Sequence, residues 1–242
     1  MISERDVERW FESSHFRKKC DWVCVDQPKV IEAWVDRHFI GQILISEDIE
    51  KPNWLDRFSY TEVSHAWLST ITQKPSHPGV MVIIERPTFK VSDLLTENRV
   101  LLLDGVQDPG NLGSILRSMV AFDIKTLCVT DDCVDVFHPK AVNASSGALA
   151  HIAVYHQKHW EDWIKTSKIP KIVLDPEAAF RVSDIKKKEN FILICGSEGR
   201  GVQNSLIKSI QLTPVCIPMG ENMESLNVAV SAGIALHHLT RV

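Results

Sequence analysis

Three short segments of the sequence are dense in glycine, proline and asparagine and also carry charged side chains. They are Asp104–Arg117, Gly196–Gly201 and Ile217–Val228. Glycine permits tight turns and close approach of the backbone to a ligand, while Asn, Glu and Arg side chains supply hydrogen-bond donors and acceptors. These segments are therefore the part of the sequence best suited to hold a ligand and act on it.

The first segment combines the start of a predicted helix with a cation. Asn111 is suited to cap that helix, and Arg117 falls about two turns into it. Free backbone N–H groups at a helix start, with an arginine nearby, favour binding of an anion such as an RNA phosphate. The spacing equally allows a surface Arg117 that pairs with Asp104 or Asp108.

The second segment, Gly196-Ser-Glu-Gly-Arg-Gly201, places a carboxylate among glycines. Glu198 is either a site carboxylate or a solvated charge. Gly199-x-Gly201 lacks the third glycine of a dinucleotide-binding loop, because Asn204 stands at that position. A nicotinamide-dependent oxidoreductase is therefore disfavoured.

The third segment separates a predicted strand from a predicted helix. Pro218 is expected to end the strand, and Ser225 is expected to cap a helix over residues 226–239. That helix is apolar nearly all round and rich in small residues, which predicts burial by the core or by a partner subunit. Asn227, in the first turn of that helix, needs a hydrogen-bond partner. It is therefore either a structural residue that stabilises the fold or a site residue.

Strand-like and amphipathic runs alternate from residue 99 onward, which predicts an α/β domain with a mostly parallel sheet and helices on both faces. The expected strands are Val100–Leu103, Thr126–Val129, Lys171–Leu174, Phe191–Cys195 and Val215–Ile217; the expected helices are Ser114–Phe122, Trp160–Thr166 and Gln203–Ile210. Ligands of such sheets bind at the carboxyl ends of strands, where loops converge. Since each of the three segments follows a predicted strand, the segments are expected to meet there.

Residues 1–86 are predicted to form a separate small α/β domain, residues 87–98 a linker, and residues 99–242 the domain with the parallel sheet. In the small domain the expected helices are Glu4–Phe11 and Pro28–Arg37, and the expected strands are Trp22–Val25, Gly41–Ser46 and Val80–Ile84.

Composition excludes some classes of function. No apolar run approaches the roughly 20 residues of a membrane span, and the charged N-terminus is unlike a signal peptide. Six cysteines without matching zinc-ligand pairs predict free thiols, no metal and a cytoplasmic protein. The net charge of −4 does not by itself suggest a nucleic-acid binder. The functional interpretation therefore rests on the motifs.

Together the three segments resemble the motifs of the SpoU/TrmH family in the SPOUT superfamily. The matching residues are Asp108-Pro-Gly-Asn111-Leu-Gly113-x-x-x-Arg117, then Gly196-Ser-Glu198-x-x-Gly201, then Ile217-Pro-Met219 followed by Ser225-Leu-Asn227-Val, with Lys140–Ala148 resembling a further element. The motifs occur in order, each after a predicted strand, over about residues 99–239.

The resemblance implies a C-terminal trefoil knot, a homodimer formed through the C-terminal domain, and transfer of a methyl group from S-adenosylmethionine (SAM) to a ribose 2′-hydroxyl of structured RNA, either ribosomal or transfer RNA. It implies SAM binding around Gly196, Ile217, Met219 and Leu226, and a catalytic Arg117 in a site shaped by Asn111, Glu198, Ser225 and Asn227. Residues 1–86 are similar to a ribosomal-protein-like substrate-binding domain, with Asp26-Gln27 where that domain often has Glu-Gly.

An arginine with a pKa above roughly 12 is a poor general base. Arg117 is therefore interpreted as an electrostatic stabiliser of the developing alkoxide that also orients a phosphate. The alternative is a non-catalytic RNA-binding protein of the same fold. Loss of Arg117, Asn111 or Glu198 would have indicated it, and all three residues are present.

Overall fold

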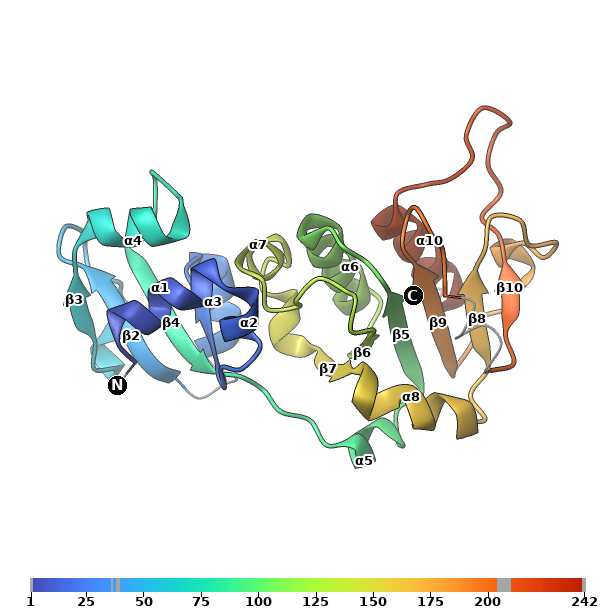
Figure 1. Ribbon diagram of the computed structural model, residues 1–242, viewed down its shortest axis with the longest axis horizontal. Helices are drawn as coiled ribbons and strands as arrows, with labels where there is room; N and C mark the ends of the chain where they lie inside the picture. Colours follow the sequence, from blue (N-terminus) through green and yellow to red (C-terminus); the bar gives the residue numbers. More distant parts are fainter. Residues whose placement is uncertain (1, 36, 38–39, 204–209, 241–242) are drawn as a thin grey trace. The chain divides into compact units, whose positions relative to one another are not determined.

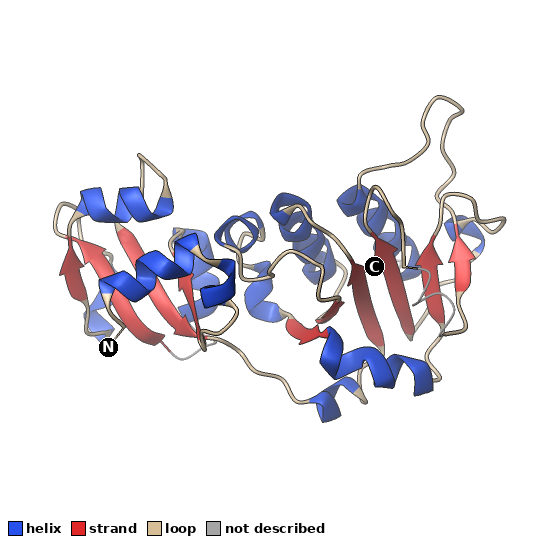
Figure 2. Cartoon of the chain, viewed as in Figure 1, coloured by secondary structure: helices blue, strands red, loops and turns tan. Residues whose placement is uncertain are grey.

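The computed structural model describes residues 2–35, 37, 40–203 and 210–240 (Figures 1 and 2). Within it, two compact units are distinguished by their internal contacts. The first comprises Met1–Pro87 together with Asp135–Ala150, and the second comprises Thr88–Val134 together with His151–Val242.

The first unit contains a four-stranded sheet in the order β1-β4-β2-β3, in which β2 and β3 are parallel and the other neighbours are antiparallel. Its strands are β1 (Trp22–Val25), β2 (Ile40–Ser46), β3 (Thr61–Val63) and β4 (Val80–Glu85); its helices are α1 (Glu4–Glu12), α2 (Ser14–Arg17), α3 (Pro28–Val35), η1 (Asn53–Arg57) and α4 (His65–Thr72). Four of these elements, β3, α2, η1 and α4, were not predicted from the sequence. β3, α2 and η1 have only three to five residues, and α4 shows no clear hydrophobic period.

Residues 135–150 also belong to this first unit, although they follow strands of the second. They contain α7 (Pro139–Ala144) and lead into η2 (Ala148–His151). A buried ion pair holds them, because Arg17 Nε lies 2.8 Å from Asp135 Oδ2 and both side chains are almost fully buried. The Arg86 guanidinium stacks 4.1 Å from the centre of the Phe137 ring.

The second unit is built on a six-stranded sheet in the order β10-β8-β9-β5-β6-β7, and every neighbouring pair is parallel. Its strands are β5 (Arg99–Asp104), β6 (Thr126–Val129), β7 (Ala153–His156), β8 (Lys171–Leu174), β9 (Phe191–Gly196) and β10 (Thr213–Val215); its helices are α5 (Val91–Leu94), α6 (Pro109–Ala121), α8 (Gln157–Thr166), η3 (Val182–Asp184) and α10 (Val228–Thr240). The predicted α/β class with a mostly parallel sheet is confirmed.

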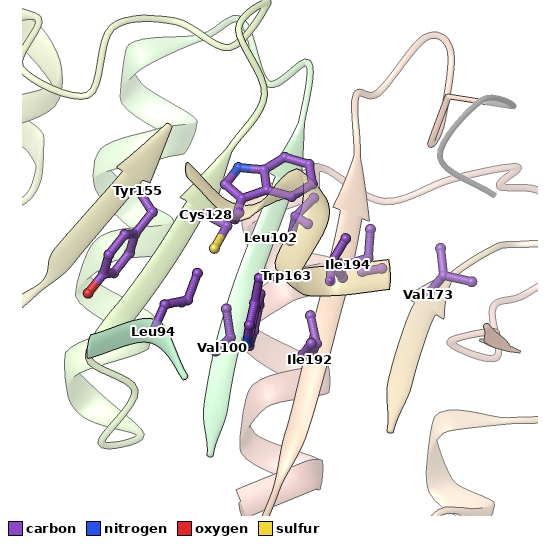
Figure 3. Packing of buried hydrophobic residues seen from close by; sticks show 11 residues of the cluster. Leu94, Val100, Leu102, Cys128, Tyr155, Trp163, Val173, Ile192 and Ile194 are labelled. Atoms are coloured by element: carbon purple, nitrogen blue, oxygen red, sulfur yellow. The ribbon is translucent and has the colours of Figure 1, made fainter. Parts of the chain in front are cut away.

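Helices cover both faces of this sheet. On one face α8 packs Trp160, Trp163 and Ile164 against a buried cluster that includes Val100 and Ile192 (Figure 3). The Trp160 indole N–H also donates to the Val129 carbonyl at 2.9 Å. On the other face α6 and α10 pack against each other, and α10 contacts β9 (Figure 1). The central strands β5, β6 and β9 are buried on both faces, which explains their nearly continuous apolar sequences.

For the end of the chain, the structure corrects one prediction, and another falls largely outside the described residues. The strand predicted over Val215–Ile217 is β10, which ends at Val215, so Ile217 and Pro218 lie beyond it and Pro218 does not end the strand. The helix predicted over Gln203–Ile210 falls mostly on residues 204–209, which lie outside the described part of the chain.

Candidate functional site

The carboxyl ends of the central strands bring the first two segments together. Asp104 at the end of β5 pairs in register with Gly196 at the end of β9. A cleft of about 390 Å³ opens beside these ends. It is lined by Gly105, Val106, Gln107, Asp108, Asn111, Asp132, Ser197, Glu198, Gly199, Arg200 and Val228. The predicted convergence of loops at one edge of the sheet is therefore observed for the segments after β5 and β9 and for the start of α10.

Helix α6 begins differently from the prediction. Asp108, not Asn111, is the N-cap, and its Oδ1 accepts a hydrogen bond from the Asn111 backbone N–H at 2.7 Å. Pro109 occupies the first turn, where its missing N–H costs nothing. Because Asp108 satisfies the helix start, the side chain of Asn111 is left to make contacts across the cleft.

Asn111, Glu198 and Asn227 form one hydrogen-bonded cluster drawn from all three segments. Glu198 Oε1 accepts from Asn111 Nδ2 at 3.0 Å, from Asn227 Nδ2 at 2.9 Å and from the Val228 backbone N–H at 3.3 Å. Asn227 Nδ2 also donates to Asn111 Oδ1 at 2.9 Å. We refer to these three residues as the Asn–Glu–Asn cluster. All three residues were expected in the site from the sequence, but a sequence pattern does not show that they touch.

Asn227 is oriented by the helix that it precedes. Helix α10 starts at Val228, and Asn227 Oδ1 accepts from the backbone N–H groups of Ala229 at 2.9 Å and Val230 at 3.4 Å. Asn227 therefore acts as the cap, and the prediction that Ser225 does so was wrong. With its oxygen held by the helix start, the Asn227 amide directs its N–H groups to Glu198 and Asn111.

The segment after β9 forms a tight turn that carries Glu198. Ser197 and Gly201 exchange backbone hydrogen bonds of 3.2 and 2.9 Å, and Gly201 has a φ of +68°. A Cβ added to Gly196 would lie 2.1 Å from the Gly201 carbonyl carbon. Glycine at residue 196 is therefore required by the close return of the chain over it.

A second polar group lies on the other side of this turn and was missed by the sequence analysis. Arg200 Nη2 lies 2.7 Å from Asp132 Oδ2 and 3.5 Å from Asp104 Oδ1. Partial burial acts to raise the pKa of Asp132, but hydrogen bonds from Thr130 and Arg200 prevail and lower it below its usual value. Asp132 follows β6, far from Arg200 in the sequence, so no local pattern reveals the pair.

Arg117 lies elsewhere on α6. It is exposed, it is not among the residues that line the cleft, and its guanidinium forms no ion pair or hydrogen bond with another described residue. The pairing with Asp104 that the spacing allowed is not observed, because Asp104 lies against Arg200 instead. The structure thus leaves this cation available at the surface of α6.

The segment between β10 and α10 contains the other expected ligand-binding positions. Ile217, Met219 and Leu226 are half-buried, Ser225 is exposed, and none of the four lines the cleft. This segment forms the long loop that leads into α10 (Figure 1). A Cβ added to Gly220 would meet no described atom within 4 Å, and the same holds for Gly199 and Gly201. Open space therefore borders the backbone of both loops, as binding of a small molecule largely by backbone groups requires.

The part of the chain that the structure describes contains no group of three or more His, Cys, Asp or Glu side chains arranged to hold a metal ion. None of its helices combines the length and the apolar character needed to cross a membrane.

Comparison with known proteins shows similarity to RNA methyltransferases. The profile of the SpoU rRNA Methylase family matches residues 98–237. The 23S rRNA (guanosine(2553)-2′-O)-methyltransferase RlmP of Bacillus subtilis is 30% identical over 215 residues, which cover 87% of this chain and 84% of RlmP.

Two solved structures share the fold over nearly the whole chain. A putative RNA methyltransferase of the TrmH family from Porphyromonas gingivalis is 26% identical with a TM-score of 0.82, covering 100% of this chain and 99% of that chain. The SpoU methyltransferase AviRb from Streptomyces viridochromogenes, solved in complex with the cofactor AdoMet, is 22% identical with a TM-score of 0.85 and covers 98% of this chain and 97% of that chain.

Proposed function

The chain belongs to the SpoU rRNA methylase family, and we propose that it transfers a methyl group from SAM to a ribose 2′-hydroxyl of structured RNA. The observation that carries this proposal is the Asn–Glu–Asn cluster, in which side chains from three separate loops interlock beside a cleft at the carboxyl ends of β5 and β9. The residues that resemble the family's motifs are therefore proposed to form the site.

Ribosomal RNA is the substrate class that we propose first. The relative with 30% identity, RlmP, is named for a guanosine of 23S rRNA, and its alignment includes most of the residues of this chain. A guanosine of 23S rRNA is therefore the target with which a search for the substrate begins, and transfer RNA is the alternative.

SAM fits the loops that follow β9 and β10. Gly196, Ile217, Met219 and Leu226 would hold it, chiefly through backbone groups, because the side chains there are absent or apolar and open space borders Gly199, Gly201 and Gly220. When bound, SAM supplies an electrophilic methyl group on its sulfonium. The chain's own contribution is then alignment and activation of the hydroxyl.

Glu198 is proposed to orient that hydroxyl in the cleft. Its Oε1 already accepts three hydrogen bonds, while its Oε2 accepts none from the described residues. The second oxygen is thus available to accept a hydrogen bond from the ribose 2′-OH. Asn111 and Asn227 keep the carboxylate in place, and Ser225, exposed just before Asn227, completes the site from the third loop.

Arg117 is proposed to stabilise a negatively charged group rather than to accept a proton as a base. Its exposed guanidinium has no partner among the described residues, so an RNA phosphate or a developing alkoxide is a natural ligand for it. Replacement of Arg117 by lysine keeps the positive charge but removes the bidentate hydrogen bonding of the guanidinium. Turnover of Arg117→Lys close to that of the wild type would contradict a role in orientation.

The proposed assembly is a homodimer formed through the C-terminal unit, whose loops form a trefoil knot. Apolar residues on α10 support this interface, since Val230 is 50% exposed and Ile234 is 39% exposed. A cytoplasmic location is proposed as well, because all six cysteines are free, as expected in a reducing compartment.

The activity is tested by incubating the purified protein with SAM carrying a labelled methyl group and with 23S rRNA or tRNA transcribed without modifications. Alkaline hydrolysis follows, because a 2′-O-methyl group protects the adjacent phosphodiester from cleavage. Label in alkali-resistant dinucleotides supports the proposal, and label in mononucleotides would assign the methyl group to a base. SAM binding without transfer to any RNA would favour the non-catalytic alternative.

A further inference from the structure

The turn that carries Glu198 is attached to the sheet by a second group of side chains on its far side. We propose that Arg200 is a positioning residue, which ties the Ser197–Gly201 turn to the ends of β5 and β6 and thereby sets the position of Glu198. This inference rests on the proposed role of Glu198 in methyl transfer.

Four side chains make up this attachment, which we call the Arg200 clamp: Asp104, Asp132, Arg200 and Gln203. Arg200 Nη2 lies 2.7 Å from Asp132 Oδ2 and 3.5 Å from Asp104 Oδ1. Gln203 donates from its backbone N–H to Asp104 Oδ2 at 2.6 Å, and its Nε2 contacts Asp104 Oδ1 at 3.0 Å and Asp132 Oδ2 at 3.3 Å. Residues before and after Gly201 are thus fixed to the same two carboxylates.

The electrostatics of the clamp depend on one cation. The Asp104 side chain is fully buried at the end of β5, and Asp132 is close enough to share the Gln203 amide with it. Arg200 is the one described cation within ion-pair distance of either carboxylate. Leaving a buried carboxylate without its counter-charge is strongly unfavourable, and a second carboxylate nearby adds repulsion. The buried thiol of Cys133, the other titratable group near Arg200, is neutral, because burial raises its pKa.

The backbone of the strand end is shaped to admit Arg200. Gly105 has a φ of +72°, and a Cβ added there would lie within van der Waals overlap of Arg200 Nη2 and 3.2 Å from Asp132 Oδ2. The guanidinium therefore lies directly against the backbone of the β5 end. Since the Ser197–Gly201 turn is closed by two backbone hydrogen bonds, a movement of Arg200 is transmitted to Glu198 two residues earlier.

If the clamp positions the turn, the Asp132→Asn substitution should restore activity that Arg200→Gln loses. Arg200→Gln leaves Asp104 and Asp132 facing each other without a cation, so the turn moves away from the strand ends. Adding Asp132→Asn removes one of the two charges and supplies an amide donor in its place. Arg200→Lys keeps the charge, but a single ammonium does not reproduce the planar guanidinium contact, so its effect is intermediate.

The experiment compares wild type, Arg200→Gln, Asp132→Asn and the double variant, with Arg99→Gln at the start of β5 as a control for loss of an arginine outside the clamp. We expect Arg200→Gln to lower kcat for RNA methylation by about 10- to 100-fold, as a small misplacement of a reacting group does, with little change in the KM for RNA. The double variant is expected to return to within about threefold of Asp132→Asn alone.

Backbone amide hydrogen exchange, followed by mass spectrometry over residues 197–203, reports on the clamp without any need for activity. We expect faster exchange in Arg200→Gln and restored protection in the double variant. Wild-type kcat in Arg200→Gln, or loss of kcat without rescue by Asp132→Asn, would overturn the inference. Unchanged protection of residues 197–203 in Arg200→Gln would also overturn it. If the wild type methylates no RNA, the proposed function fails, and the exchange data still decide whether the clamp exists.

Discussion

Asn227 combines two tasks that substitution should separate. Its Oδ1 caps α10, and its Nδ2 holds Glu198 and Asn111, each at 2.9 Å. Asn227→Ala removes both tasks. Asn227→Ser keeps a hydroxyl that caps the helix and loses the amide donors, so it serves as the matched control.

The expected sizes follow from the contacts. Loss of the cap in Asn227→Ala should cost about 1 kcal/mol of unfolding free energy, which lowers Tm by about 2–4 °C in a chain of this size. Asn227→Ser should lose less Tm than Asn227→Ala, because it keeps the helix cap. Each variant removes a hydrogen bond to a charged carboxylate, worth about 1.5–3 kcal/mol. If that energy is expressed in the transition state, kcat falls by about 10- to 100-fold in both variants.

Differential scanning calorimetry and single-turnover methyl transfer measure the two effects separately. Equal loss of Tm in Asn227→Ala and Asn227→Ser would refute the assignment of the cap. Wild-type turnover in Asn227→Ser would refute the role of the amide in holding Glu198.

Three other predictions concern residues at separate places in the chain. Gly196→Ala should abolish SAM binding, measured by calorimetry, because its Cβ would collide with the backbone of Gly201; normal affinity would show that the turn adapts. Arg117→Ala should lower kcat/KM for RNA by about 100-fold, the cost of a bidentate contact to a charged group, while SAM affinity, checked by the same calorimetry, stays the same. In the first unit, burial acts to raise the pKa of Asp26, but the His77 imidazole 3.5 Å away and a hydrogen bond from Lys74 prevail and lower it below its usual value. Its carboxylate therefore contributes stability in full above about pH 5 and loses it as the pH falls through the folded-state pKa, so urea unfolding should show Asp26→Asn destabilised at pH 7 and the difference shrinking below pH 4.

The alternation of apolar strands and amphipathic helices was sufficient to predict the parallel sheet. Val100–Leu103 and Phe191–Cys195 are buried on both faces, so their continuous apolar runs are unambiguous. β3 has three residues, too few to show a period, β7 is only partly buried and includes a histidine, and β10 contains an exposed proline. The association of residues 135–150 with the first unit depends on long-range contacts, such as the Arg17–Asp135 ion pair and the stacking of Arg86 on Phe137, which no local pattern encodes.

The site residues could be chosen from the sequence because their types suit binding and their loops follow strands. Their contacts could not, since Asn111 and Asn227 meet across 116 positions of chain. The two caps were misassigned for a physical reason. Several Ser, Asp and Asn residues precede each helix, and only the backbone path decides which of them accepts from the free N–H groups. Arg200 was overlooked because its partners end other strands.

The most direct test of the proposed activity identifies the product itself. Unmodified 23S rRNA is incubated with the wild-type protein and SAM carrying a trideuterated methyl group, then digested to nucleosides and analysed by mass spectrometry beside Asn227→Ser. The account predicts a 2′-O-methylnucleoside three mass units heavier than its natural form, formed by the wild type and strongly reduced by the variant. A deuterated methyl group on a base, or equal yields from both proteins, would contradict it.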